Sequence, residues 1–123
     1  MIMTRKFTTD HEWIDFDGHI ATVGITDYAV AQLGDVVFAE LPEIGTNVTK
    51  GDGCAVVEST KAASDVYAPL TGVITAINQD IVDNPALVNE SAQDKAWFFK
   101  IEISPDTDMD GLMNSDEYSA LIA

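Results

Sequence analysis

The feature that most constrains the fold is a symmetrical run of small and β-branched residues over positions 55–69. Around the central pair Lys61-Ala62, Val57 matches Val66 and Ala55 matches Ala68. Two strands joined by a two-residue turn need this arrangement, because paired residues in a hairpin share one face of the sheet. The pattern therefore predicts a β-hairpin with Lys61 at its tip.

Other short segments rich in Val, Ile or aromatic residues lie on both sides of this hairpin, separated by Gly and Pro. They run from Val36 to Leu41, from Val73 to Ile77 and from Trp97 to Ile103. His11 to Ile25 alternates polar with apolar residues around Asp17-Gly18, which predicts a second hairpin. Many short strands with tight turns are typical of a barrel or sandwich, so we expect a mostly β fold.

Two segments carry the signals of short helices. Thr26-Asp27 supplies an N-cap and an acidic first turn, and Gly34 stands where helices commonly end. Ser115 to Ile122 predicts a C-terminal helix, with Asp116 and Glu117 favourably placed in its first turn. We therefore expect one short internal helix and one helix at the end of the chain.

The length of 123 residues predicts one domain over 1–123. We expect its β structure over about 5–104 and an acidic helical tail over about 105–123. A net charge of −15 argues against binding to nucleic acids or anionic membranes, because phosphates would be repelled. The same charge favours a monomer. It indicates either partners with basic surfaces or simply an abundant protein that its acidity keeps soluble.

The N-terminal residues and the hydropathy bear on where the protein works. No apolar run approaches the roughly 20 residues that span a bilayer, and no secretory signal precedes Phe7. We expect a cytoplasmic protein, or one of the mitochondrial matrix if the chain is a trimmed eukaryotic one.

The sequence offers no constellation typical of a catalytic centre or a zinc site. His11 and His19 have no partner at ligand spacing, and no serine lies in a nucleophile context. Cys54 is the only cysteine and sits among small apolar residues, so we interpret it as part of the core. We expect a protein without catalytic activity of its own and without a metal.

A lysine at the tip of a rigid hairpin suits a covalently attached group. Amide formation removes the charge of Lys61, and an attached cofactor can carry electrons or a carbon fragment that no side chain carries. A lysine in a polar turn is more often simply solvated, so the hairpin alone leaves both interpretations open.

The blocks around Lys61 and elsewhere resemble the H protein of the glycine cleavage system. The resemblance extends over nearly the whole chain, and several blocks in the same order are far more specific than one lysine. They are His11-Glu12-Trp13, Ala21 to Thr26, Gln32 to Val37, Glu58 to Asp65 and Asp83 to Asn89.

The resemblance implies a fold, a cofactor and a set of partners. The fold would be a flattened barrel-sandwich of two antiparallel sheets, similar to lipoyl and biotinyl domains, with lipoate in amide linkage to Lys61. A lipoate ligase or lipoyltransferase would attach it. A pyridoxal-phosphate glycine decarboxylase would load an aminomethyl group onto the arm, a tetrahydrofolate-dependent aminomethyltransferase would remove the carbon, and dihydrolipoyl dehydrogenase would reoxidise the dithiol.

The resemblance also implies that the loaded arm folds back into a surface cleft, lined by Glu12, Ser64 and Asp65. A carboxylate beside a protonated amine favours the ammonium form. The alternative is that Glu12 and Asp65 are solvated turn residues. Ser91 to Ala96 departs from the family, which usually has a Pro- and Gly-containing loop here, so contacts of this loop with partners stay open.

Two other interpretations stay open. Asp106, Asp108, Asp110 and Glu117 fit the ligand spacing of an EF-hand, but Pro105 and the strand expected before it leave no entering helix. The sequence therefore favours a chance match over a calcium site. The chain would otherwise be a lipoyl relay or carrier for 2-oxoacid dehydrogenases, or an unmodified binding module; a biotin carrier would flank its lysine with methionines, unlike Thr60 and Ala62.

Overall fold

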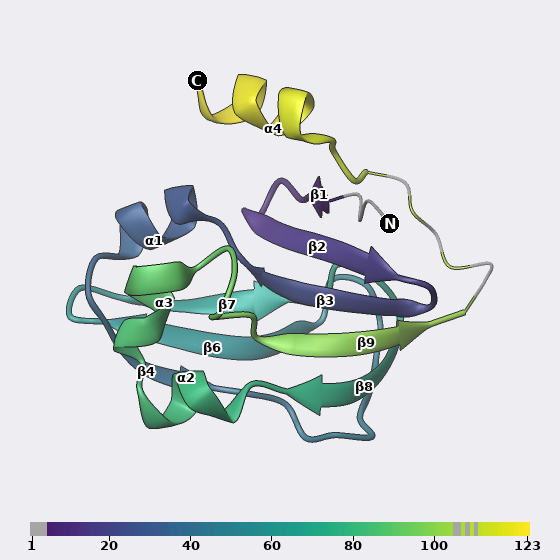
Figure 1. Ribbon diagram of the computed structural model, residues 1–123, viewed down its shortest axis with the longest axis horizontal. Helices are drawn as coiled ribbons and strands as arrows, with labels where there is room; N and C mark the ends of the chain where they lie inside the picture. Colours follow the sequence, from purple (N-terminus) through teal and green to yellow (C-terminus); the bar gives the residue numbers. More distant parts are fainter. Residues whose placement is uncertain (1–4, 105–106, 108, 110) are drawn as a thin grey trace.

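The computed structural model describes residues 5–104, 107, 109 and 111–123, and these form a β sandwich with short helices around it (Figure 1). The described strands make two antiparallel sheets, in the orders β1-β2-β3-β9-β8-β5 and β4-β6-β7. The expected mostly β fold of two antiparallel sheets is confirmed. The strands are β1 (Arg5–Phe7), β2 (Glu12–Asp17), β3 (Ile20–Ile25), β4 (Val36–Glu40), β5 (Asn47–Val48), β6 (Gly53–Ser59), β7 (Ala63–Tyr67), β8 (Gly72–Ile77) and β9 (Phe99–Ile103).

The predicted hairpin around Asp17-Gly18 is confirmed by β2 and β3. Asp17 pairs with Ile20, and Gly18 takes the positive φ of 61° that the tight turn requires. The predicted internal helix is α1 (Asp27–Leu33), in which the hydroxyl of Thr26 accepts the N–H of Ala29 at 3.3 Å. Local turn and capping chemistry therefore places both elements where the sequence indicates.

The hairpin that carries Lys61 is confirmed, but its predicted register is wrong. The structure pairs Val57 with Ser64 and Ala55 with Val66, so the turn is centred on Thr60-Lys61 instead of Lys61-Ala62. The hydroxyl of Ser59 accepts the N–H groups of Lys61 and Ala62, each at 3.1 Å, and closes the turn one residue earlier. Both centres put the same residues on the same face, so the apolar pattern does not distinguish between them.

Two short helices were not expected from the sequence. α2 (Gln79–Asp83) and α3 (Ala86–Ser91) lie on either side of Asn84-Pro85, a pair that is typical of a turn. Each is too short to show a helical period of apolar residues, and each buries one side chain, Ile81 or Val88. The core between the sheets fixes these helices more than their own sequences do.

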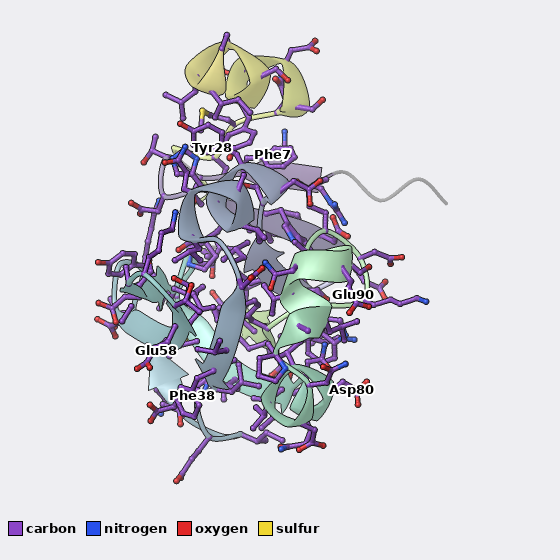
Figure 2. The ribbon with its side chains drawn as sticks, turned by 90° about the vertical axis from the view of Figure 1, so that its left-hand side faces the viewer. Phe7, Tyr28, Phe38, Glu58, Asp80 and Glu90 are labelled. Atoms are coloured by element: carbon purple, nitrogen blue, oxygen red, sulfur yellow. The ribbon has the colours of Figure 1, made fainter. Side chains whose placement is uncertain are left out.

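The C-terminal helix α4 (Ser115–Ile122) is confirmed and packs outside the sandwich, above β1 and α1 in Figure 1. Tyr118 stacks on Phe7 with ring centroids 4.6 Å apart and planes at 6°, and Trp13 completes this small cluster. Figure 2 shows Phe7 and Tyr28 beneath the helix. α4 thereby connects the end of the chain to the region where β2 and α1 begin. No described helix is long and apolar enough to cross a membrane.

Candidate functional site

The structure has a cleft of about 430 Å³ beside the hairpin that carries Lys61. We call it the arm cleft. One wall is α1, the other is the turn before β2 together with the start of β7, and Val57 and Val66 contribute to its apolar lining. Its lining residues are Asp10, His11, Glu12, Ile25, Tyr28, Ala29, Gln32, Leu33, Val57, Ala62, Ala63, Ser64, Asp65 and Val66.

Lys61 is exposed at the tip of the β6–β7 hairpin. The tip of this hairpin lies at the left edge of Figure 1, below α1. The tip is held to the body by the N–H of Thr60, which donates to the carbonyl of Asp35 at 3.2 Å. The side chain of Lys61 lies over Gly34, where an added Cβ would come within 3.2 Å of Cε. The lysine is therefore accessible, and its stem already lies against the C-terminal end of α1.

Glu12 lines the arm cleft as a buried residue and not as a solvated turn residue. Its side chain is 2% exposed, and its carboxylate accepts the hydroxyl of Thr8 at 3.0 Å and the N–H of Tyr67 at 2.8 Å. Burial raises the pKa of Glu12 to about 7, against the lowering effect of these two hydrogen bonds. A cation in the cleft would favour the ionised carboxylate.

Ser64 and Asp65 also line the arm cleft, from the edge strand β7. Ser64 is paired with Val57, a buried residue of the cleft lining. The carboxylate of Asp65 also lies beside Gly53, and Asp65 lines a neighbouring groove together with Cys54. The structure thus brings Glu12, Ser64 and Asp65 to one cleft next to the hairpin tip that carries Lys61.

The acidic tail provides no described site for calcium. Asp106, Asp108 and Asp110 lie outside the described residues, and β9 rather than a helix precedes them in the chain. Glu117 closes a capping box of α4: its carboxylate accepts the N–H of Asn114 at 3.0 Å, and the Asn114 side chain accepts the N–H of Glu117. Glu117 is therefore engaged as a helix cap.

Comparison with known proteins decides the family. The sequence model of one family, described as glycine cleavage H-protein, matches residues 5–123. The chain belongs to this family. A glycine cleavage system H protein from Bradyrhizobium diazoefficiens is 56% identical over 117 residues, which cover 95% of this chain and 96% of the relative. One from Paramagnetospirillum magneticum is 55% identical over 119 residues, covering 97% and 95%.

A solved structure agrees with the family assignment. The crystal structure of a glycine cleavage system H protein from Mycobacterium marinum has a TM-score of 0.86 and 37% identity, covering 98% of this chain and 97% of that one. As a member of the H-protein family, the chain is a non-catalytic lipoyl carrier of the glycine cleavage system. The other proteins of that system are its partners.

Several residues of this H protein's site were missed in the sequence. Asp10, Tyr28 and Gln32 line the arm cleft. The sequence does not show how α1 lies relative to β7, so it could not indicate that these residues face one cleft. Asn89 supports the tip from α3: its side chain accepts the N–H of Val36 and donates to the carbonyl of Gly34, each at 2.8 Å. Asn89 lies in one of the family-like blocks, which was the available signal.

Proposed function

We propose that Lys61 is the residue that carries lipoate, through an amide between its Nζ and the lipoyl carboxyl group. The observation that supports this proposal is the position of Lys61, exposed at a hairpin tip whose base is rigid and whose side borders the arm cleft. A modifying enzyme can reach the lysine, and the resulting arm can either swing outward to an enzyme or lie along α1. The dithiolane supplies the chemistry of carrying the aminomethyl group and electrons.

The arm cleft suits the loaded form of such an arm. Its apolar lining, which includes Ile25, Leu33 and Val57, suits a hydrocarbon chain. Within the cleft, Glu12 offers a carboxylate, and Asp65 and Ser64 add polar groups on β7. These groups favour the ammonium form of an aminomethyl group, which has no lone pair with which to expel the sulfur. The cleft would thereby preserve the intermediate between enzymes.

The same arm would visit four kinds of enzyme in turn. A lipoate ligase or lipoyltransferase attaches it, a pyridoxal-phosphate glycine decarboxylase loads it, a tetrahydrofolate-dependent aminomethyltransferase unloads it, and dihydrolipoyl dehydrogenase reoxidises it. The net charge of −15 favours transient contacts with basic surfaces on these enzymes and a monomeric carrier. We place this cycle in the cytoplasm.

Mass spectrometry tests the attachment. The full chain, incubated with a lipoate ligase, ATP and lipoate, is expected to gain one lipoyl group, located by peptide mapping at Lys61. Lys61→Arg should gain none. Lys95→Arg is the matched control, because Lys95 is also exposed but lies far along the chain in another loop, and it should be modified like the wild type. A lipoyl group on Lys95, or none on Lys61, would contradict the proposal.

A second experiment separates glycine cleavage from service to a 2-oxoacid dehydrogenase. Lipoylated protein is mixed with glycine decarboxylase and labelled glycine, and the aminomethyl group on the protein is measured. We expect one labelled group per lipoyl arm. A protein that accepts lipoate but no carbon from glycine would indicate a lipoyl relay or a lipoyl carrier for another enzyme system.

A further inference from the structure

Two hydroxyl groups and one imidazole form a chain between α4 and the arm cleft. The hydroxyl of Tyr118 lies 2.7 Å from Oγ1 of Thr26 and 2.8 Å from Nδ1 of His11. Thr26 is fully buried and Tyr118 is 5% exposed, so water does not readily substitute for either partner. We call this set the hydroxyl relay. It joins the last helix of the chain to the beginnings of β2 and α1.

Burial of Thr26 determines which way the protons point. Its Oγ1 accepts the N–H of Ala29 as the N-cap of α1, and among the described residues the only oxygen or nitrogen left to receive its proton is the oxygen of Tyr118. A buried hydroxyl that donates to nothing is costly, so Thr26 donates to Tyr118. The Tyr118 proton is then free for Nδ1 of His11, and burial, which raises the pKa of Tyr118, keeps that proton in place.

The position of His11 is set by the backbone as well. It is the only described residue other than glycine with a positive φ, 67°, a conformation that costs energy and often occurs at functional sites. Two hydrogen bonds hold it: its N–H donates to Thr8 at 3.1 Å, and its carbonyl accepts the N–H of Thr26 at 3.0 Å. With Nδ1 directed to Tyr118, the nitrogen left for the cleft that His11 lines is Nε2, which has no partner among the described residues.

We propose that Tyr118 is a positioning residue that fixes His11 as the Nε2–H tautomer, so that the arm cleft meets a hydrogen-bond donor there and not a base. This inference rests on the proposed function of the cleft as the shelter of the loaded arm. If Nδ1 accepts a hydrogen bond from the hydroxyl of Tyr118, the neutral ring carries its own proton on Nε2. The lone pair on Nδ1 then accepts the hydrogen bond from Tyr118 and is not available to the cleft.

An imidazole lone pair open to the cleft would add a base to the carboxylates of Glu12 and Asp65 that line it. A base that removes a proton from the aminomethyl ammonium frees the nitrogen lone pair. That pair forms a C=N bond while the C–S bond breaks, and the bonding electrons leave on sulfur as a thiolate. Water then converts the iminium ion to formaldehyde and ammonia, with no change in oxidation state. A ring that offers only N–H to the cleft does not start this sequence.

Nitrogen NMR of the imidazole tests the relay on the unmodified chain, independently of lipoate. In the wild type, the ¹⁵N shifts of His11 at a pH where the ring is neutral should show a protonated Nε2 and an unprotonated Nδ1. Tyr118→Phe keeps the ring that stacks on Phe7 and removes only the hydroxyl, and it should reduce this preference toward that of a free imidazole. A protonated Nδ1 in the wild type would overturn the inference whether or not Lys61 is lipoylated.

The lifetime of the loaded arm tests the consequence. With lipoylated protein loaded from glycine and separated from the decarboxylase, Tyr118→Phe should release ammonia about three- to tenfold faster than the wild type, the loss expected for one hydrogen bond. An unchanged lifetime in a variant that is lipoylated and loaded normally would overturn the role of the relay, while leaving the carrier function intact. Failure of loading in the wild type would count against the proposed function alone.

A second variant separates the relay from mere attachment of α4. Ile122 packs against the cluster of Phe7, Trp13 and Tyr118 but takes no part in the relay. Ile122→Ala should weaken the contact of α4 while His11 keeps the Nε2–H tautomer, and the loaded arm should decay at nearly the wild-type rate. If Ile122→Ala shortens the lifetime as much as Tyr118→Phe with the tautomer unchanged, the relay is not the cause.

Discussion

The carboxylate of Glu12 accepts the backbone N–H of Tyr67 at 2.8 Å and so joins the start of β2 to the end of β7. Burial raises the pKa of Glu12 from 4.5 to about 7, so between these values the folded protein binds a proton that the unfolded chain has lost. The free energy of unfolding should therefore fall as the pH rises from about 4.5 to about 7, by about 3 kcal/mol in all. Urea denaturation at several pH values measures this change.

Glu12→Gln provides the control for this pH dependence. Glutamine keeps a carbonyl for the N–H of Tyr67 and can place its amide against the hydroxyl of Thr8. The variant should show a much flatter profile across the same pH range and should equal or exceed the wild type in stability above pH 7. A wild-type protein that becomes more stable across this range would contradict the assignment of the proton to Glu12.

A Cβ atom added at Gly34 should affect both the stability of the fold and the modification of Lys61. Its φ of 85° and ψ of −152° lie in a region open essentially to glycine, and an added Cβ would meet Cε of Lys61 at 3.2 Å. Gly34→Ala should lower the free energy of unfolding by about 1–3 kcal/mol and slow lipoylation, because the lysine stem is displaced. Thermal unfolding and the rate of lipoyl transfer measure the two effects. Ala31→Gly, at an exposed position of α1, is the control. It should lower the free energy of unfolding modestly without slowing lipoylation.

The parts of the fold that the sequence predicted well are those fixed by local chemistry. Thr26 and Gly34 delimit α1, and the turn at Gly18 closes the β2–β3 hairpin, because caps and tight turns require particular residue types. The register of the β6–β7 hairpin was wrong because one Ser59 hydroxyl decides it, and the apolar pattern is the same for both alternatives.

The residues of the candidate site also divide into those that the sequence indicated and those that only the fold brings together. Glu12, Ser64 and Asp65 came from a resemblance in sequence, and the structure brings them to one cleft beside the hairpin tip that carries Lys61. That the Glu12 carboxylate is buried was not predictable, since the N–H of Tyr67 that it accepts lies 55 residues away along the chain. The hydroxyl relay needs contacts over 92 and 107 residues, which no local pattern reports.

Asn89 should support the hairpin tip from a distance. It bridges Gly34 and Val36, on either side of the carbonyl of Asp35 that receives the N–H of Thr60. Asn89→Asp keeps an acceptor for the N–H of Val36 but turns a second oxygen toward the carbonyl of Gly34. The variant should therefore lower the free energy of unfolding by about 1 kcal/mol. Hydrogen exchange should show faster exchange at Thr60 and Val36. Asn84→Asp, at the end of α2, should leave both amides unchanged.

Gly24 and Trp13, which are paired on β3 and β2, pack closely against each other in the described sheet. An added Cβ at Gly24 would lie 2.6 Å from two carbons of the indole and 2.7 Å from its nitrogen. The ring is 1% exposed, and its N–H donates to the carbonyl of Ala92 at 2.9 Å, so it has no room to retreat without losing that bond. Gly24→Ala should therefore destabilise by about 3 kcal/mol.

A double-variant cycle shows whether the indole is the cause of this destabilisation. Trp13→Phe removes the three indole atoms that the new methyl group would meet, so Gly24→Ala should cost much less in that background than in the wild type. Gly53→Ala is the matched single control, because its Cβ would make only an ordinary contact at 3.9 Å with Asp65. Urea denaturation of the four proteins of the cycle gives the coupling. Equal costs of Gly24→Ala in both backgrounds would mean that backbone strain, and not the indole, excludes a side chain at position 24.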